Sequence, residues 1–175
     1  MIEYKQYITI RSTAMTQYIP ATLPLLEKQW DKTITTHPGD IRWVKWKDEY
    51  ISYNKTGMAI TFLVVIDGEP VGETTLITSP RCLAVKGRPT LCDGRTVANV
   101  NAVRITKAHE GQGHISQLVK VVENYARRQG YSRLTIGASA DNQRNNAIYR
   151  HWGYDEIVLT EQEGGEKVIY YRKNL

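Results

Sequence analysis

Apolar and polar residues follow one another along the first part of the chain in patterns that predict a strand and a helix. Residues 7–11 alternate with a period of two, as a short strand does. Residues 13–32 predict a helix that Pro20 and Pro24 interrupt or bend, because proline lacks the backbone N–H that a helix interior needs. The segment at 36–40 contains proline and glycine and is expected to be a loop.

A second helix is expected at 41–55, where large aromatic residues recur at helical spacing. Four of them are separated by three, four and three residues and therefore share one face of the helix: Trp43, Trp46, Tyr50 and Tyr53. Such a face is typical of core packing, and the alternative is that it forms one wall of a pocket that receives a substrate.

The middle of the chain predicts three strands. Residues 59–66 form an apolar, β-branched run, and the Asp-Gly pair that follows is typical of a hairpin turn. Residues 71–78 are the returning strand and residues 96–106 are a further one. An irregular excursion that contains proline and glycine is expected between these two strands, at 79–95.

The last third of the chain predicts two helices, a strand between them and a closing hairpin. An amphipathic helix is expected to begin at the glycines 111 and 113 and to end at Gly130. The other expected elements are a strand at 132–138, a short helix at 145–151 and paired strands at 154–159 and 167–172. The expected order is therefore strand, two helices, three strands, helix, strand, helix and two strands.

Length and composition indicate one ordinary globular domain that covers residues 1–175. The 175 residues are 41% hydrophobic and 23% charged, which argues against wholesale disorder. No apolar run approaches the roughly 20 residues that span a bilayer. The N-terminus lacks the apolar segment of a signal peptide. A cytoplasmic protein with no membrane partner is therefore expected.

The charge balance narrows the possible binding partners only slightly. The 23 Lys and Arg against 18 Asp and Glu give a net charge of +5, which suits a nucleotide cofactor, nucleic acid or an acidic membrane. A nucleic-acid-binding module is a disfavoured alternative, because the basic residues are spread along the chain without a binding motif. The four histidines have no ligand spacing and CxxC is absent, so no metal is expected. Cys82 and Cys92 are expected to be free thiols.

Residues 103–119, VRITKAHEGQGHISQLV, predict a strand that enters a glycine-rich turn and then an amphipathic helix. The first amides of such a helix are unpaired, and with the helix dipole they form a site for an anion. Gly111 and Gly113 allow the anion to approach the backbone closely. Similar turns also begin helices that bind nothing, so this segment alone leaves its function open. It has neither the GK[ST] of a P-loop nor a third glycine at Ser116, where a dinucleotide fingerprint has one.

Residues 134–156, LTIGASADNQRNNAIYRHWGYDE, are the second candidate segment. They predict a strand, a polar stretch, a short helix and then an aromatic-glycine-aromatic sequence. Asn142 and Asn145 lie near the start of the helix, and Tyr149 lies one to two turns into it. Tyr149 is either a core residue with a satisfied hydroxyl or a proton donor beside the strand end.

Together the two segments resemble the GCN5-related N-acetyltransferases, the GNAT superfamily. Residues 103–119 look like the acyl-CoA motif of that family, and the spacing of Asn142, Tyr149 and Gly153 looks like its next motif. The order of the expected elements matches over nearly the whole chain. The resemblance implies an α+β fold in three α/β/α layers. It has a mixed, mostly antiparallel twisted sheet of six to seven strands flanked by about four helices.

The resemblance also implies an activity, a co-substrate and a set of binding residues. The expected reaction is transfer of an acetyl group from acetyl-CoA to the primary amine of a small-molecule acceptor, which attacks the thioester directly. The protein is expected to be a monomer or a homodimer. In the family, the segment that corresponds to 110–116 wraps the pyrophosphate, and the strand before it offers backbone groups to the pantetheine arm. The implied cofactor-binding residues are Val103, Ile105, Glu110, Gly111, Gln112, Gly113, His114, Ile115, Ser116, Asn142 and Asn145.

Proton transfer is assigned to a few further residues. The resemblance implies that Tyr149 protonates the departing CoA thiolate. The general base is left open between Glu73 on the third strand and Asp93 in the excursion, either of which would act through a water. Asn101 is the alternative that orients a water or the acceptor. No GxSxG motif is present, so no covalent intermediate on the enzyme is expected.

Two alternatives share the same cofactor. One is an enzyme that acetylates a protein N-terminus or a lysine, and the other is a family member that binds acyl-CoA without catalysis. The second arises because the family usually has Arg or Gln where Glu110 stands and Gly or Ala where Ile115 stands.

Overall fold

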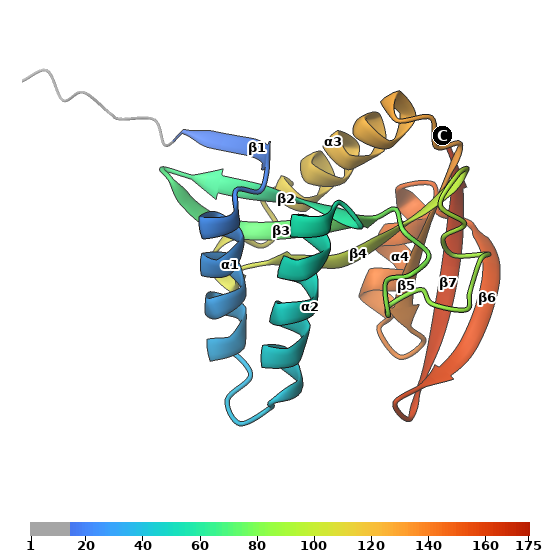
Figure 1. The fold of residues 1–175 in the computed structure, drawn as a ribbon, viewed down its shortest axis with the longest axis horizontal. Coiled ribbons are helices and arrows are strands. Elements are labelled where there is room, and N and C mark those ends of the chain that lie inside the picture. The colour runs from blue at the N-terminus through green and yellow to red at the C-terminus, as the bar shows by residue number, and fades with distance from the viewer. Residues whose placement is uncertain (1–14) are drawn as a thin grey trace, which may run out of the picture.

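One sheet of seven strands organises the fold (Figure 1). The computed structural model describes residues 15–175, so the strand expected at 7–11 lies outside the described residues. The strand order across the sheet is β1-β2-β3-β4-β5-β7-β6; β4 and β5 run parallel, and the other neighbours are antiparallel. The strands are β1 Thr16–Pro20, β2 Ala59–Ile66, β3 Glu69–Ile77, β4 Val97–Ile105, β5 Arg133–Ser139, β6 Glu156–Glu163 and β7 Glu166–Asn174.

Helices cover both faces of this sheet. In the described part of the chain they are α1 Leu23–Thr35, α2 Arg42–Thr56, α3 His114–Arg128 and α4 Gln143–His151, with a short 3-10 helix, η1, at Lys107–His109. Figure 1 shows α1 and α2 standing side by side on the face opposite to α3 and α4. The expected α+β fold, with a mixed and mostly antiparallel sheet and about four helices, is confirmed.

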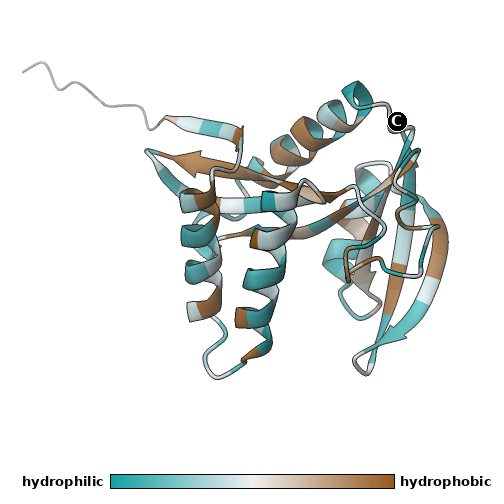
Figure 2. Ribbon diagram, in the orientation of Figure 1, coloured by the Kyte–Doolittle hydropathy of each residue, from teal (hydrophilic) through white to brown (hydrophobic). Residues whose placement is uncertain are grey.

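Each face of the sheet has its own hydrophobic core. On one face Leu118 of α3 and Tyr149 of α4 belong to a single buried cluster. On the other face Leu26 and Trp30 of α1 pack with Tyr50 of α2. β2 has helices above and below it, and Figure 2 shows it as largely hydrophobic along its length, as a strand covered on both faces should be.

The helix expected at 13–32 is wrong in its first half. Thr16–Pro20 forms β1, an edge strand antiparallel to β2, and α1 begins only at Leu23. Pro20 ends the edge strand, a position that tolerates a residue without an N–H. Pro24 lies in the first turn of α1, where the N–H would have no helical partner. The two prolines therefore separate two elements, because pairing with β2 overrides the local helix pattern.

The other expected elements occur in the expected order, with boundaries that differ by up to a few residues. α2 ends at Thr56, and Gly57 caps it in the left-handed conformation with a φ of 72°. The segment at 79–95 is irregular, and it contains the buried free thiols Cys82 and Cys92. Among the residues that the structure describes, no helix is long and apolar enough to cross a membrane.

β4 and β5 pair over only part of their length. Val97–Val100 lies beside Arg133–Ile136, and beyond these residues the two strands separate. Ala102 follows the last paired residues of β4 with a φ of 52°, in the left-handed region. The Oδ1 of Asn101 accepts the Ala102 N–H at 2.8 Å and so holds this bend. The result is an opening between the carboxyl ends of two parallel strands.

The left-handed backbone of Ala102 predicts a difference between two substitutions. Ala102→Val should lower the free energy of unfolding by about 2 kcal/mol, because a β-branched side chain is strained at positive φ. Ala102→Gly should stay within about 1 kcal/mol of the parent, since relief of strain offsets the added freedom of the unfolded chain. Urea unfolding measures both. Equal stability of the two variants would contradict the assignment of strain to this residue.

Candidate active site

Three cavities lie around the separated ends of β4 and β5. The phosphate-loop cavity, of about 790 Å³, extends from the turn before α3 to α1 and α4. The aromatic cavity, of about 530 Å³, lies between α2, the 79–95 excursion and the β6–β7 hairpin. The strand-gap cavity, of about 300 Å³, lies between β4 and β5 themselves. The aromatic and strand-gap cavities share Asn101, and the strand-gap and phosphate-loop cavities share Tyr149.

Most of the residues expected to bind the cofactor line the phosphate-loop cavity. Those that do are Val103, Ile105, Glu110, Gly111, Gly113, His114, Ile115, Ser116 and Asn145. Gln112 and Asn142 are not among the lining residues. Asn142 instead caps α4, because its Oδ1 accepts the backbone N–H of Asn145 at 3.0 Å.

The turn that opens α3 has the geometry of an anion site. Gly111 and Gly113 have φ values of 72° and 82°, which disfavour residues with a side chain, and Gly113 caps the helix without a side-chain hydrogen bond. An added Cβ at either glycine would meet nothing within 4 Å, so the space beside the turn is open. The first amides of the 15-residue helix α3 are therefore available to a ligand.

Cationic and polar side chains surround this turn. Lys107 and His109 line the same cavity, and the Nδ1 of His114 lies 2.9 Å from the hydroxyl of Tyr18 on β1. The Nε2 of His114 lies 3.2 Å from the Oε1 of Gln112. Gln112 thus contacts a cavity residue although it does not line the cavity. These groups would favour a ligand with negative charge.

The two departures from the family pattern are accommodated differently. The carboxylate of Glu110 is exposed and lies 3.9 Å from the guanidinium of Arg144, at the start of α4 across the cavity. A pair so exposed contributes little to stability. Ile115 lines the cavity and also packs against the core around α3. Its side chain is therefore held partly by the fold and partly faces the ligand space.

Tyr149 lies where the phosphate-loop and strand-gap cavities share a wall. Its side chain is buried, and burial raises the pKa of the phenol to about 12. Burial is the one cause of this shift, and no hydrogen bond joins the Tyr149 hydroxyl to another group among residues 15–175. The phenol is therefore protonated at neutral pH and free to donate to a ligand.

Asn101 lines both the aromatic and the strand-gap cavities. Its Oδ1 accepts the hydroxyl of Tyr50 at 2.8 Å in addition to the amide of Ala102. The aromatic stripe of α2 serves both expected purposes. Tyr50 and Tyr53 are buried in the core, and Tyr50 also lines the aromatic cavity together with Trp46.

The structure places the two base candidates away from the cavities. Glu73 is fully buried and accepts the Nε of Arg104 at 2.8 Å, while its Oε2 has no partner among the described residues. Burial raises the pKa of Glu73, and the adjacent guanidinium opposes part of that rise. Asp93 accepts the amides of residues 95–97 and the hydroxyl of Thr96. Burial acts to raise the pKa of Asp93, but these hydrogen bonds lower it well below the usual range.

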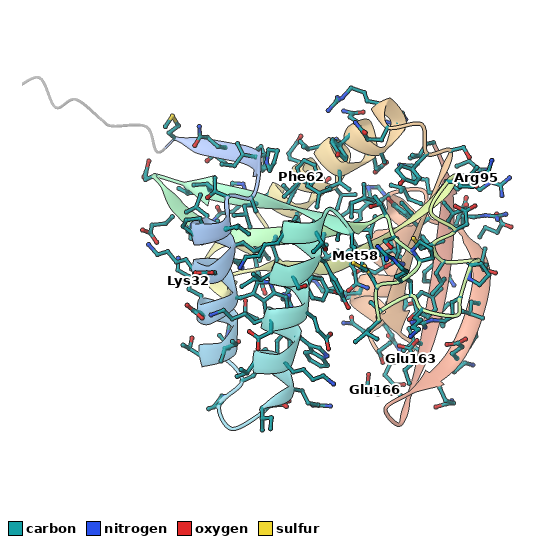
Figure 3. The ribbon with its side chains drawn as sticks, viewed as in Figure 1. Lys32, Met58, Phe62, Arg95, Glu163 and Glu166 are labelled. Carbon is teal, nitrogen blue, oxygen red and sulfur yellow. The ribbon has the colours of Figure 1, made fainter. Side chains whose placement is uncertain are left out.

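Several residues at the cavities are absent from the sequence-based prediction. The one feature of the sequence that could have drawn attention to Arg104 is its charge within a mostly apolar strand. Tyr170 of β7 donates to Glu163 at 2.6 Å, and Arg88 of the excursion pairs with Glu163. Figure 3 shows Glu163, the last residue of β6, near the turn of the β6–β7 hairpin. Arg88 is 75 residues from Glu163 in the sequence, so no local pattern brings these two together.

The fold is similar to those of several solved acetyltransferase structures. A structure of a putative GNAT acetyltransferase from Desulfovibrio desulfuricans is 11% identical, with a TM-score of 0.68, over 93% of this chain and 99% of that chain. A Salmonella typhimurium acetyltransferase that modifies the N-terminal serine of ribosomal protein L7/L12 is 14% identical, with a TM-score of 0.67, over 93% and 96%. An Elizabethkingia anophelis GNAT acetyltransferase with acetyl-CoA bound is 17% identical, with a TM-score of 0.57, over 91% and 98%.

At these identities the likeness concerns the fold. A search of the curated proteins found no match. The family model described as the acetyltransferase (GNAT) family matches residues 20–154. This range includes the first motif segment, all but the last two residues of the second, and every residue that lines the phosphate-loop cavity. The chain therefore belongs to the GNAT acetyltransferase family.

Proposed function

We propose that this protein transfers an acetyl group from acetyl-CoA to a primary amine of a small-molecule acceptor. One observation carries the proposal: a cavity with an anion-binding turn at one end leads to a protonated tyrosine, Tyr149, at the gap between β4 and β5. A second cavity, with aromatic walls, lies beside the same gap and shares Asn101 with it. The arrangement separates a place for the donor from a place for the acceptor.

The residues present fit an acyl-CoA. The open space beside Gly111 and Gly113 admits a pyrophosphate to the amides at the start of α3. Val103 and Ile105, on the end of β4 that no longer pairs with β5, would hold the pantetheine arm. Acetyl-CoA supplies an activated thioester and a thiol leaving group. The relative from Elizabethkingia anophelis, which has acetyl-CoA bound, supports this assignment.

Within this proposal Tyr149 is the general acid and Asn101 positions the acceptor. A phenol whose pKa is raised by burial keeps its proton until a stronger base, such as a thiolate, arrives beside it. Asn101 presents its amide to both cavities, so it lies where an amine would approach. Glu73 touches none of the three cavities, so its contribution to proton removal would pass through Arg104 or a water.

A protein N-terminus is the alternative acceptor. The Salmonella typhimurium relative, which modifies the N-terminal serine of a ribosomal protein, favours it. The two alternatives are separated by incubating the protein with acetyl-CoA and a panel of small amines and peptides, and following free thiol. Thiol release with small amines supports the proposal. Absence of both CoA binding and thiol release across the panel would overturn it.

Removal of the Tyr149 hydroxyl should slow the chemical step. Tyr149→Phe is expected to lower kcat about 100-fold or more, since a general acid contributes on that scale, with little change in acetyl-CoA affinity. Tyr125→Phe is the matched control, because Tyr125 is a partly buried tyrosine of α3 that lines none of the cavities. Steady-state kinetics and calorimetry measure the two effects. Unchanged turnover in Tyr149→Phe would show that Tyr149 is not the acid.

The raised pKa of Tyr149 also predicts how kcat should depend on pH. A phenol with a pKa of about 12 holds its proton at all lower pH values. The acid itself should therefore cause no loss of kcat below about pH 11, and any alkaline decline at lower pH must come from another group. The pH dependence of kcat in parent and Tyr149→Phe tests this, because a decline that disappears in the variant would assign a lower pKa to Tyr149.

Neutralising Glu110 should strengthen cofactor binding. Glu110→Gln removes a carboxylate beside the turn, and the affinity for CoA should rise about two- to fivefold at low salt and less at high salt. Glu27→Gln, at an exposed site on α1, makes the same change in net charge away from the cavity. Calorimetry at two salt concentrations measures both variants. Equal gains in the two, or weaker binding in Glu110→Gln, would contradict the placement of the pyrophosphate.

A further inference from the structure

Arg104 stands at the junction of the two large cavities. It is the one described residue that lines both the phosphate-loop cavity and the aromatic cavity. It belongs to the part of β4 that no longer pairs with β5, opposite Glu73 on β3. A group bound to its guanidinium would therefore lie between the donor and the acceptor.

The guanidinium is rigidly held but mostly unpaired. Its Nε donates to Glu73 at 2.8 Å, and its carbon lies 4.4 Å from the ring centroid of Trp30 and 5.2 Å from that of Trp43. An arginine has five N–H donors, and among residues 15–175 only this Nε donor has a partner. Nη2 is buried without a partner, and the side chain is 23% exposed. Unpaired donors in such a place favour an acceptor from a ligand.

The carboxylates that line the aromatic cavity already have a cation nearby. Glu163 accepts from Tyr170 and pairs with Arg88. Glu49 lies 4.0 Å from the ammonium of Lys45. In the phosphate-loop cavity, Glu110 lies beside Arg144, as described above. No described carboxylate other than Glu73 therefore neutralises Arg104, and the free edge of its guanidinium remains positive.

Resting on the proposed acyl transfer, we propose that Arg104 binds a carboxylate of a substrate at this junction. A planar guanidinium held against two aromatic rings suits bidentate binding of a carboxylate. Two sources have this chemistry: the α-carboxylate of an amino-acid acceptor, reached from the aromatic cavity, and the terminal carboxylate of a dicarboxylic acyl-CoA, reached from the phosphate-loop cavity. In both cases Glu73 is a positioning residue that fixes the orientation of Arg104 through Nε.

The test compares matched probes with and without a carboxylate. Succinyl-CoA against acetyl-CoA tests the donor source, and L-phenylalanine against L-phenylalaninamide tests the acceptor source. The parent protein should bind and use the carboxylate-bearing member of one pair at least tenfold better, as one charge-assisted contact allows. The pair in which the preference occurs identifies the source.

Variants then assign the preference to Arg104. Arg104→Lys keeps a cation beside Glu73 but loses the planar fork, and it should reduce the preference several-fold. The double variant Arg104→Gln with Glu73→Gln removes both charges, so no buried carboxylate is left unpaired, and it should abolish the preference. Arg128→Lys, exposed on α3, is the matched control and should leave the preference unchanged. Thermal unfolding confirms that each variant is folded.

The outcomes separate this inference from the proposed function. Acetyl transfer without a carboxylate preference in either pair, or a preference that persists in the double variant, would overturn the role of Arg104 and leave the transferase intact. If no acyl transfer occurs, calorimetric binding of the same probes still decides: a tenfold preference lost in the double variant supports the carboxylate site, and equal binding overturns it.

Discussion

The separation of β4 from β5 after Val100 and Ile136 is the constraint on which the rest of the site depends. While parallel strands remain paired, ladder hydrogen bonds occupy their backbone groups and leave no room for a ligand between them. Asn101 and Ala102 mark the end of the pairing, because the amide side chain satisfies the Ala102 N–H while the positive φ turns the chain. From there the end of β4 that has left β5, the glycine turn and the start of α3 follow one another as one continuous wall of the phosphate-loop cavity.

A series of buried and partly buried hydrogen bonds keeps this separation rigid. Tyr50 of α2 donates to Asn101, Asn101 donates to Asn99, and Asn99 donates to Thr135 of β5. Thr135 in turn donates to the carbonyl of Leu91 in the excursion. This series of bonds connects α2, β4, β5 and the excursion, and its side-chain amides are satisfied by other members of the series. A helix, two strands and a loop thus hold a single geometry at the point where the strands separate.

The parts of the site that depend on local chemistry could be predicted from the sequence, and the parts that depend on pairing across the sheet could not. Gly111 and Gly113 indicated an open turn because positive φ is a property of single residues. Glu73 was one of two candidate bases because it is a carboxylate on a strand, and no local pattern indicated that it meets Arg104, which is 31 residues away. The first half of the helix predicted at 13–32 was wrong for a similar reason, because β1 forms by pairing with the edge of β2. Local patterns carry no information about such partners.

The hydrogen bond between Tyr18 and His114 connects the edge strand β1 to the first residue of α3. The two residues are 96 positions apart in the sequence. Through this one contact the stability of β1 in the sheet is linked to that of the start of α3. A ligand that orders the turn before α3 should therefore raise the free energy needed to detach β1 from the sheet. The size of this increase depends on how strongly the Tyr18–His114 bond couples the two elements. Slower amide hydrogen exchange along β1 would report occupancy of a cavity that this strand does not itself line.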